Sequence, residues 1–567
     1  MAQPDKGVAC GGWMRYPCTL AVLLLIAAYS LVFLYWLHTV QPLLPVEDGG
    51  GYLYQSFVTY DKLRANPAGI VDIFLHCEFN FKPPMLFFSA ALGYFILGES
   101  IQSAYLVVLI WVIVILTALY VIGRQLGSPC IGLAAVLFTL GFLWFHFTVI
   151  GFLTEVPLTA FILLSLHMAL MPAVLKDWKK TLLLGLTLAW GLLSRLEFLF
   201  YIFPAGAYVL FSNIRDLKEE AVFRIGAVAL ITALLVVPWY AVNYQTAVGD
   251  LYNHAFSSQK NLLGLLFAWD SIVFYPLSYF KSSPLLFTVG LVAFVWAFLR
   301  GDRRLKMIVL TIAAILLVNF IAKCKVLRHI IPVLPLFGLL VGSLFSKVKN
   351  PAASCGTSRG VLHSPDRRNP IIPATKSGVC LSERINGGKA RFAAFSILLC
   401  ISAYSTYSFF FIYKDNRLEG KPWYPDDRSS ELVDLILKTH TGTAQIIPTT
   451  YLSSSYNSGT VMAVSTLRGS PILVNDIIGW VSGAPKYNLS TFSYPWFINV
   501  ADYIIRSNRT ECVVSFGPIE DCNAVVRGLE AAFEEQRSNF TKIGSIHSER
   551  DGEIEVYGRS VNGVRSP

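Results

Sequence analysis

The chain has 567 residues, and its mean hydropathy of +0.55 is far above that of a soluble protein. Residues of the AVILMFWYC set make up 54%, and only 14% are charged, whereas a soluble domain carries about 25% charged residues. This composition excludes a disordered, fibrous or wholly cytosolic chain. The net charge of +10 could suggest a nucleic-acid partner, but the basic residues lie beside apolar segments of bilayer length.

Residues 18–37 form the first apolar segment, which contains no charged side chain. At about 1.5 Å rise per residue it can cross the roughly 30 Å hydrocarbon core of a bilayer. A cleaved signal peptide is the alternative, but its apolar region would have about 7–15 residues and end at small residues. Because this segment ends in large aromatic residues, it predicts a spanning helix.

The loop after this helix carries two polar motifs. Glu47 and Asp48 precede three glycines, and a carboxylate there could act as a general base or bind a cation; an ordinary acidic loop is the alternative. Lys82 precedes a Pro-Pro pair that begins an apolar helix, and at the membrane interface its ammonium group suits a lipid phosphate or extends into water. That helix, residues 85–98, is too short to span and is expected to be interfacial or re-entrant.

The remaining apolar segments bring the total to about eleven spans. They are residues 101–122, 131–150, 156–175, 181–193, 198–211, 221–242, 284–299, 307–322, 330–345 and 392–413. With a cytoplasmic N-terminus, alternate segments collect most of the Lys and Arg residues that precede the last span, among them Arg124, Lys176, Arg215 and Arg300. The positive-inside rule therefore fixes the orientation and places the C-terminal tail outside the cytosol.

Further charged residues lie at the outer ends of later spans. Glu155 begins a span in a Thr-Glu-Val-Pro motif, and Arg195 and Glu197, between two short spans, are expected to pair. Lys325, Arg328 and His329 belong to a cationic cluster on the side that the positive-inside rule leaves poor in cations. This exception predicts an anionic ligand.

The predicted organisation has a cytoplasmic N-terminus (1–17), a membrane body (18–345) with its first outside loop at 38–100, a flexible basic cytoplasmic loop (346–391), a last span (392–413) and an outside domain (414–567). The tail is expected to be a small α/β domain. Its predicted elements are helices at 430–440 and 524–536, strands at 445–448, 472–474 and 553–557, and a helix, turn and strand over 503–515.

Cysteines and sequons add little. A disulfide between Cys512 and Cys522 is a hypothesis, allowed by their predicted location outside the cytosol. Three N-x-S/T sequons, which begin at Asn488, Asn508 and Asn539, lie in the same predicted domain.

No cofactor is predicted with certainty, and a divalent cation stays open. His76, Cys77 and Glu78 could ligate zinc, with His329 as a further candidate, but adjacent residues rarely all face one ion.

The order of these motifs carries a resemblance to a known class. An acidic motif after the first span, Lys-Pro-Pro in the same loop, Thr-Glu-Val-Pro at a later outer turn and Arg-His-Ile-Ile-Pro-Val-Leu-Pro opening a late span resemble the polyprenyl-phosphate-sugar glycosyltransferases of the GT-C class. The chain is similar to the lipid A aminoarabinose transferases and, more distantly, to the protein O-mannosyltransferases. The resemblance covers roughly residues 18–345 and implies a polytopic α-helical membrane fold.

The resemblance also implies roles for particular residues. The catalytic acid of that class lies in the first outside loop in an Asp-Glu-x-Arg-Tyr-like pattern, which Asp48 and Tyr52 match at its ends. Here the residues between them are all glycine and Glu47 comes before Asp48, so either acid is a candidate base. The class lysine that contacts lipid phosphate matches Lys82, and its late-span arginine matches Arg328.

The chemistry suits this placement because a departing phosphate is already a stable anion and needs no general acid, unlike the alkoxide in glycosidases. One carboxylate would accept the proton of an acceptor hydroxyl, and Lys82, Arg328 and Lys325 would hold the phosphate. Tyr52, Glu155 and His329 are further candidate substrate-binding residues. The expected partners are a polyprenyl-phosphate-linked sugar donor, a lipid, glycan or protein acceptor and membrane lipids, without nucleic acid.

Two other classes of function remain as alternatives. A secondary transporter or flippase for an anionic lipid or metabolite would use the same cations, but transport sites lie near the bilayer midplane, whereas these charges cluster at the outer face. A receptor would need a cytoplasmic signalling domain, which this sequence does not show. The expected location is the cell (inner) membrane with an extracytoplasmic C-terminal domain, and the endoplasmic reticulum membrane is the alternative.

Overall fold

The structure is a computed structural model, and most of the predicted membrane body lies within the residues that it describes. The described residues are 15–39, 48–77, 82–171, 174–213, 219–244, 269–321, 327–347, 393–412, 429–439, 444–448, 461–462, 465–466, 468, 472–474, 494–507, 519–548 and 552–560.

The described chain up to residue 412 is built from helices joined by short turns and contains no sheet within those residues. Their bounds are α1 (Arg15–Thr39), α2 (Asp48–Ala65), α3 (Ile70–Leu75), α4 (Met85–Leu97), α5 (Ile101–Gln125), α6 (Pro129–Leu140), α7 (Leu143–Ile150), α8 (Glu155–Leu170), α9 (Trp178–Leu192), α10 (Phe198–Asn213), α11 (Glu219–Val242), α14 (Trp269–Ser282), α15 (Pro284–Arg300), α16 (Arg303–Ile321) and α17 (Val333–Lys347). Short 3-10 turns lie at Pro67–Gly69, Val174–Lys176 and Leu327–Ile330. The last helix, Ala393–Phe410, ends in a π-helical turn at Ser408–Ile412.

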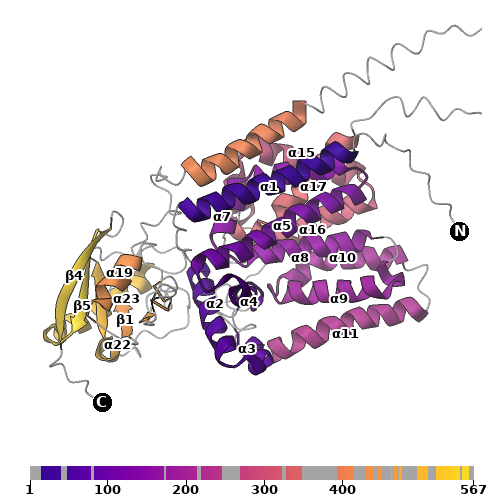
Figure 1. Ribbon diagram of the computed structural model, residues 1–567. Helices are drawn as coiled ribbons and strands as arrows, with labels where there is room; N and C mark the ends of the chain where they lie inside the picture. The colour runs from indigo at the N-terminus through magenta and orange to yellow at the C-terminus, as the bar shows by residue number, and fades with distance from the viewer. Residues whose placement is uncertain are drawn as a thin grey trace, which may run out of the picture.

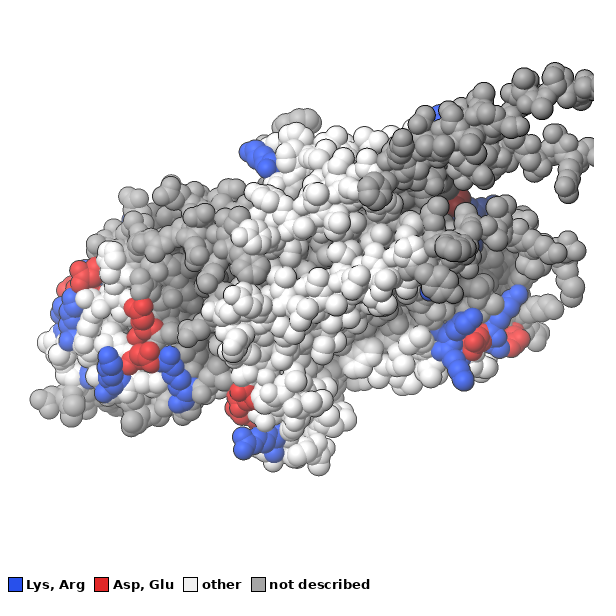
Figure 2. All heavy atoms as spheres, turned by 45° about the horizontal axis from the view of Figure 1, so that its top comes forward, with Lys and Arg blue, Asp and Glu red and all other residues white. Residues whose placement is uncertain are grey.

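The helices identify a multi-pass membrane protein. Within the described residues, five helices are long and apolar enough to cross a membrane, or six if the bent pair α6 and α7 forms one broken span. Shorter apolar helices lie at Met85–Leu97, Glu155–Leu170, Phe198–Ser212, Pro284–Arg300 and Val333–Ser346. Figure 2 shows a broad uncharged surface over the helices, with charged side chains gathered at its ends. The total of about eleven spans stays a prediction.

Residues 131–150, predicted as one continuous span, are two helices. α6 and α7 meet at an angle of 71°. The break leaves backbone carbonyls without helical partners, and buried polar groups require hydrogen bonds. Side chains supply them here. Leu140 O lies 2.9 Å from His146 Nε2, and Gly141 O accepts a hydrogen bond of 2.6 Å from Ser405 Oγ in the last helix. These bonds make the bend a stable feature of the fold, which apolar periodicity does not reveal.

The first loop is helical and lies at one end of the long helices. α2, α3 and α4 gather there, and α1 begins at the opposite end (Figure 1). α4 has 13 residues, about 20 Å at 1.5 Å per residue, which is too short to span. It packs against α2 and α5.

The C-terminal part contains a five-stranded sheet with the order β2-β1-β3-β5-β4. β1 pairs in parallel with β2 and β3, and β5 pairs antiparallel with β3 and β4. The strands are β1 (Ala444–Pro448), β2 (Ile472–Val474), β3 (Tyr503–Ser507), β4 (Phe540–Ser548) and β5 (Gly552–Arg559), and the helices are α19 (Ser429–Leu437), α22 (Tyr494–Val500) and α23 (Ile519–Glu535).

Two apolar layers sandwich this sheet. Leu432 and Ile436 of α19 cover one face, and Leu529 and Phe533 of α23 cover the other. Tyr503–Ser507 was expected to begin a helix, but it is the central strand β3. A strand buried on both faces shows an unbroken apolar run rather than alternation, so the short run did not distinguish strand from helix.

Cys512 lies outside the described residues, and so does the side chain of Cys522. Asn488 and Asn508 of the predicted sequons and the loop 348–392 lie outside them as well.

Candidate active site

Asp48 lies at the start of α2, the first helix after α1. A carboxylate in the first turn is favoured by the partial positive charge of the helix N-terminus. Glycines at 49–51 cost the helix about 1 kcal/mol each relative to alanine, but all three are buried, so packing and not helix propensity holds this turn. Tyr52, one turn further, is buried with its ring stacked on Phe87 at 6.3 Å between centroids.

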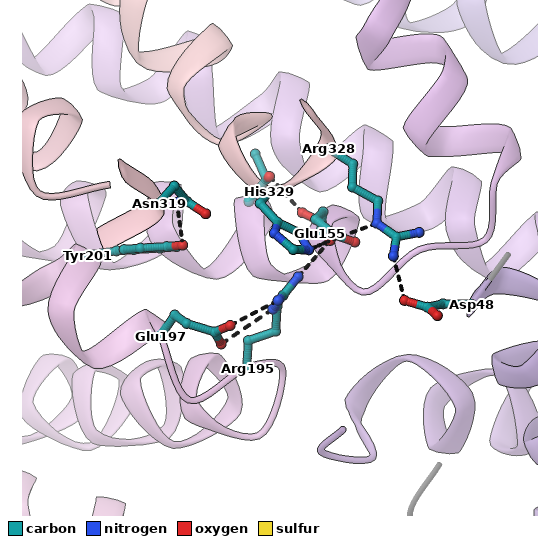
Figure 3. Close-up of polar contacts among 9 residues, drawn as sticks. Asp48, Glu155, Arg195, Glu197, Tyr201, Asn319, Arg328 and His329 are labelled. Atoms are coloured by element: carbon teal, nitrogen blue, oxygen red, sulfur yellow. Dashed lines mark hydrogen bonds and ion pairs between the residues drawn. The ribbon is translucent and has the colours of Figure 1, made fainter. Parts of the chain in front are cut away.

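Asp48 and Arg328 form an ion pair between residues 280 positions apart in the sequence. Arg328 Nη2 donates to Asp48 Oδ2. The arginine lies in the Leu327–Ile330 turn that precedes α17, and its side chain is largely buried. Figure 3 shows both side chains pointing toward one another. The fold therefore joins the acidic motif of the first loop to the late cationic motif.

Glu155 is the centre of the cluster and only 2% exposed. Its Oε1 lies 2.6 Å from Arg195 Nη1, 3.7 Å from Arg328 Nε and 3.7 Å from His329 Nε2. The turn before it is strained, since Phe152 has a φ of 50°, which a bulky residue seldom adopts. This turn places the carboxylate between two guanidinium groups (Figure 3).

Arg195 joins Glu155 to Glu197. Arg195 Nη2 lies 2.9 Å from Glu197 Oε1, which confirms the predicted pair. Burial alone would raise the pKa of the Glu197 carboxyl, but the charges of Arg195 and Lys82 outweigh it and lower that pKa to about 2. Burial alone would lower the pKa of the Arg195 guanidinium, but the two carboxylates outweigh it and raise that pKa. Arg195 and Glu197 are therefore both charged at neutral pH.

Lys82 is half-buried, just before the buried Pro83-Pro84 pair. Its positive charge acts on both Asp48 and Glu197. Burial would raise the pKa of the Asp48 carboxyl, but the charges of Arg328, Lys82 and Arg195 outweigh it and hold that pKa below its ordinary value. Asp48 is therefore a carboxylate at neutral pH, the form that a general base requires.

The structure thus brings together Asp48, Lys82, Glu155, Arg328 and His329 of the predicted site, with Tyr52 beside them. Glu47 and Lys325 lie outside the described residues. The sequence predicts Arg195 and Glu197 near the outer face but does not assign them to the site. Their charges between two short spans are the signal that points to them.

A neutral pair that the sequence does not predict lies beside the charged cluster (Figure 3). Asn319 Nδ2 in α16 donates to Tyr201 Oη in α10 at 2.9 Å. Nothing in the local sequence marks a single asparagine in an apolar helix as part of a site.

The metal hypothesis finds no support in the donor set. The side chain of His76 is exposed and that of Cys77 is buried; Cys77 Sγ lies 3.1 Å from Thr59 Oγ1. Glu78 lies outside the described residues. Within the parts that the structure describes, no three His, Cys, Asp or Glu side chains are grouped as metal ligands.

Replacing Arg195 by methionine is expected to destabilise the fold by about 3–5 kcal/mol, because it leaves two buried carboxylates without their shared partner. The apparent melting temperature of the detergent-solubilised protein measures this. Arg506→Met is the control, since its pairs with Glu530 and Glu534 are more exposed and worth about 0–1 kcal/mol. Equal shifts for the two variants would contradict the structural importance of the buried pairs.

The sequence and the fold of this chain are similar to those of known membrane glycosyltransferases. A family model of dolichyl-phosphate-mannose-protein mannosyltransferases matches residues 81–239, which include Lys82, Glu155 and Arg195. The crystal structure of ArnT from Cupriavidus metallidurans bound to undecaprenyl phosphate superposes with a TM-score of 0.56 at 14% identity, covering 96% of this chain and 99% of that one. The fold is that of the GT-C glycosyltransferases.

A second solved structure has the same GT-C fold. The oligosaccharyltransferase AglB from Archaeoglobus fulgidus, in complex with an inhibitory peptide and a dolichol-phosphate, has a TM-score of 0.52 at 12% identity, covering 96% of this chain and 74% of that one. A search of curated protein sequences gives no match. The comparisons confirm the resemblance to the GT-C class, including the aminoarabinose transferases and the O-mannosyltransferases.

Proposed function

We propose that this protein is an integral membrane glycosyltransferase that moves a sugar from a polyprenyl-phosphate donor to a lipid, glycan or protein acceptor. The observation that carries the proposal is the meeting of Asp48 with Arg328, inside a cluster that also contains Lys82. A carboxylate that can act as a base lies there beside cations that suit a phosphate. ArnT binds undecaprenyl phosphate in its crystal structure, which supports a donor of this kind.

In the proposed reaction, Asp48 accepts the proton of the acceptor hydroxyl while the oxygen attacks the anomeric carbon of the donor. The bond from that carbon to the phosphate oxygen breaks, and the lipid phosphate leaves with the electron pair. Lys82 and Arg328, with Lys325 as a further candidate, stabilise the growing negative charge by charge-assisted hydrogen bonds. A single displacement inverts the configuration at the sugar.

We infer that the site faces the extracytoplasmic side. α1 begins at the end of the helices opposite α2, α3 and α4, and the C-terminal sheet lies near these first-loop helices (Figure 1). With the N-terminus cytoplasmic, as the positive-inside rule indicates, both the cluster and the C-terminal domain are outside the cytosol.

The test is transfer of a labelled sugar, by the purified and reconstituted protein, from a panel of polyprenyl-phosphate sugars. Transfer with inversion supports the proposal. Flux of an anionic solute or lipid across proteoliposomes without any transfer would replace it by the transporter alternative.

Replacing Lys82 by alanine is expected to weaken binding of polyprenyl phosphate by about 10–100-fold, because a hydrogen bond to a charged group is worth about 1.5–3 kcal/mol. Binding to the protein in nanodiscs measures the loss. Lys62→Ala, an exposed lysine near the far end of α2, is the matched control. Equal affinity in the Lys82 variant and the control would remove Lys82 from the phosphate site.

A further inference from the structure

The outer end of α11 differs from the rest of that helix. Along most of its length α11 presents large apolar side chains to the surroundings, such as Leu230 and Leu234, which are 60% and 64% exposed. At its end, Trp239 is fully buried and Asn243, just beyond the helix, is 7% exposed. These two side chains turn away from the predicted lipid face and toward the first loop.

Both side chains donate hydrogen bonds to backbone carbonyls of that loop. Asn243 Nδ2 lies 2.8 Å from Leu75 O, and Trp239 Nε1 lies 3.3 Å from Cys77 O. Leu75 is the last residue of α3, and the last carbonyls of a helix have no partner within it. Asn243 therefore caps the last carbonyl of α3, and Trp239 holds the carbonyl of Cys77, two residues beyond the helix.

Apolar packing strengthens the same junction. Trp239 belongs to a buried cluster with Leu193 and Ala189 of the α9 end, and Phe74 and Leu75 of α3 pack against it. The ring of Phe74 also meets that of Phe88 in α4, edge to face at 4.9 Å. The junction thus joins α3, α4, α9 and α11.

Described residues that precede and follow Lys82 in the sequence are both anchored to other elements. Before it, the Cys77 carbonyl is held by Trp239, and the Cys77 side chain contacts Thr59 of α2. After it, the backbone N–H of Met85 donates to Leu193 O at 3.1 Å. Trp239 and Leu193 belong to the same buried apolar cluster, so one cluster adjoins both anchor points.

We propose that Trp239 and Asn243 are positioning residues that hold the Lys82 segment in place for the lipid phosphate. The inference rests on the proposed function for the role of Lys82 but concerns residues outside the charged cluster. Neither residue contacts the cluster in any of the interactions described above. They act through the backbone of residues 75–77, and a shift of about 1 Å in a positioning group can cost on the order of 100-fold in rate.

The experiment compares Asn243→Leu and Trp239→Phe, which remove the donors and keep most of the volume, with Thr232→Val as the control. Thr232 Oγ1 donates to Gly185 O at 3.1 Å from the middle of the same helix. The first measurement is the rate at which an amine-reactive ester labels Lys82, followed by mass spectrometry on the full-length protein in nanodiscs. Leaving a buried carbonyl unsatisfied costs about 1–3 kcal/mol, so we expect labelling about 10-fold faster in both variants and unchanged in the control.

The second measurement is sugar transfer in a double-mutant cycle with Lys82→Ala. We expect Asn243→Leu alone to raise KM for the donor about 10-fold. In the Lys82→Ala background it should leave KM almost unchanged, because both substitutions remove the same interaction. A merely structural role would lower activity equally in both backgrounds.

Unchanged Lys82 labelling in the folded variants, or fully additive losses, would overturn the proposal. The labelling rate does not depend on catalysis. If the wild-type protein transfers no sugar, the proposed function fails, and labelling still decides whether these residues position Lys82.

Discussion

Replacing Asp48 by asparagine is expected to lower sugar transfer by about 10²–10⁴-fold, the contribution of a general base, while the protein remains folded. Asparagine has nearly the same shape but cannot accept the proton of the acceptor hydroxyl. Binding of polyprenyl phosphate should persist, because Lys82 and Arg328 are unchanged. Transfer of labelled sugar and lipid-phosphate binding, measured on the same reconstituted preparation, separate these two effects.

Asp61→Asn is the matched control, since Asp61 lies in the same helix but is exposed near its far end. This variant should transfer sugar like the wild type. If Asp48→Asn kept full transfer, the base would lie elsewhere, and Glu47→Gln would be the next variant to measure.

Much of the charged cluster could be predicted from the sequence. Charged residues at the ends of apolar helices cost free energy in a membrane protein, so their presence indicates a functional site. Asp48, Lys82, Glu155 and Arg328 were all found in this way, and the structure brings them together. Sequence spacing could not give their pairing. That Arg328 lies between Asp48 and Glu155 depends on how segments 280 positions apart pack.

The features that the sequence did not predict share a physical cause: contacts between distant parts of the chain determine their local structure. The break between α6 and α7 depends on Ser405, far along the chain, which bonds Gly141 O. β3 has a short apolar run that periodicity cannot assign, and its two neighbouring strands determine its conformation. The α3 cap is supplied by α11, so no local sequence signal predicts it.

Charge balance links the stability of the cluster to its proposed chemistry. Asp48, Glu155 and Glu197 contribute three negative charges, and Lys82, Arg195 and Arg328 contribute three positive ones. Arg195 contacts Glu155 and Glu197 and is fully engaged. Arg328 also contacts Asp48, so an incoming phosphate and the base would compete for the same guanidinium. This makes Arg328 the residue whose loss should alter both binding and proton transfer.

Replacing Arg328 by glutamine is expected to lower kcat/KM by at least 100-fold near neutral pH. The variant loses a cation for the phosphate, and breaking a buried pair by removing one partner costs about 3–5 kcal/mol, which is equivalent to more than two powers of ten in an equilibrium constant. Arg304→Gln, on the exposed cytoplasmic end of α16 in the predicted topology, is the control. Steady-state transfer kinetics measure the difference.

The same variant should change the pH dependence in a defined direction. In the wild type, Arg328 helps to hold the pKa of Asp48 below its ordinary value against the opposing effect of burial, so the carboxylate persists to acid pH and transfer should hold down to about pH 5. In the variant, the positive charge of Arg328 no longer opposes the effect of burial, so the pKa of Asp48 rises. Transfer is then lost at a higher pH, because the base becomes protonated there. The acid limb of kcat/KM reports the free enzyme. An acid limb at the same pH in both proteins would show that Arg328 does not control the ionisation of the base, and a limb at lower pH would contradict the assignment of Asp48.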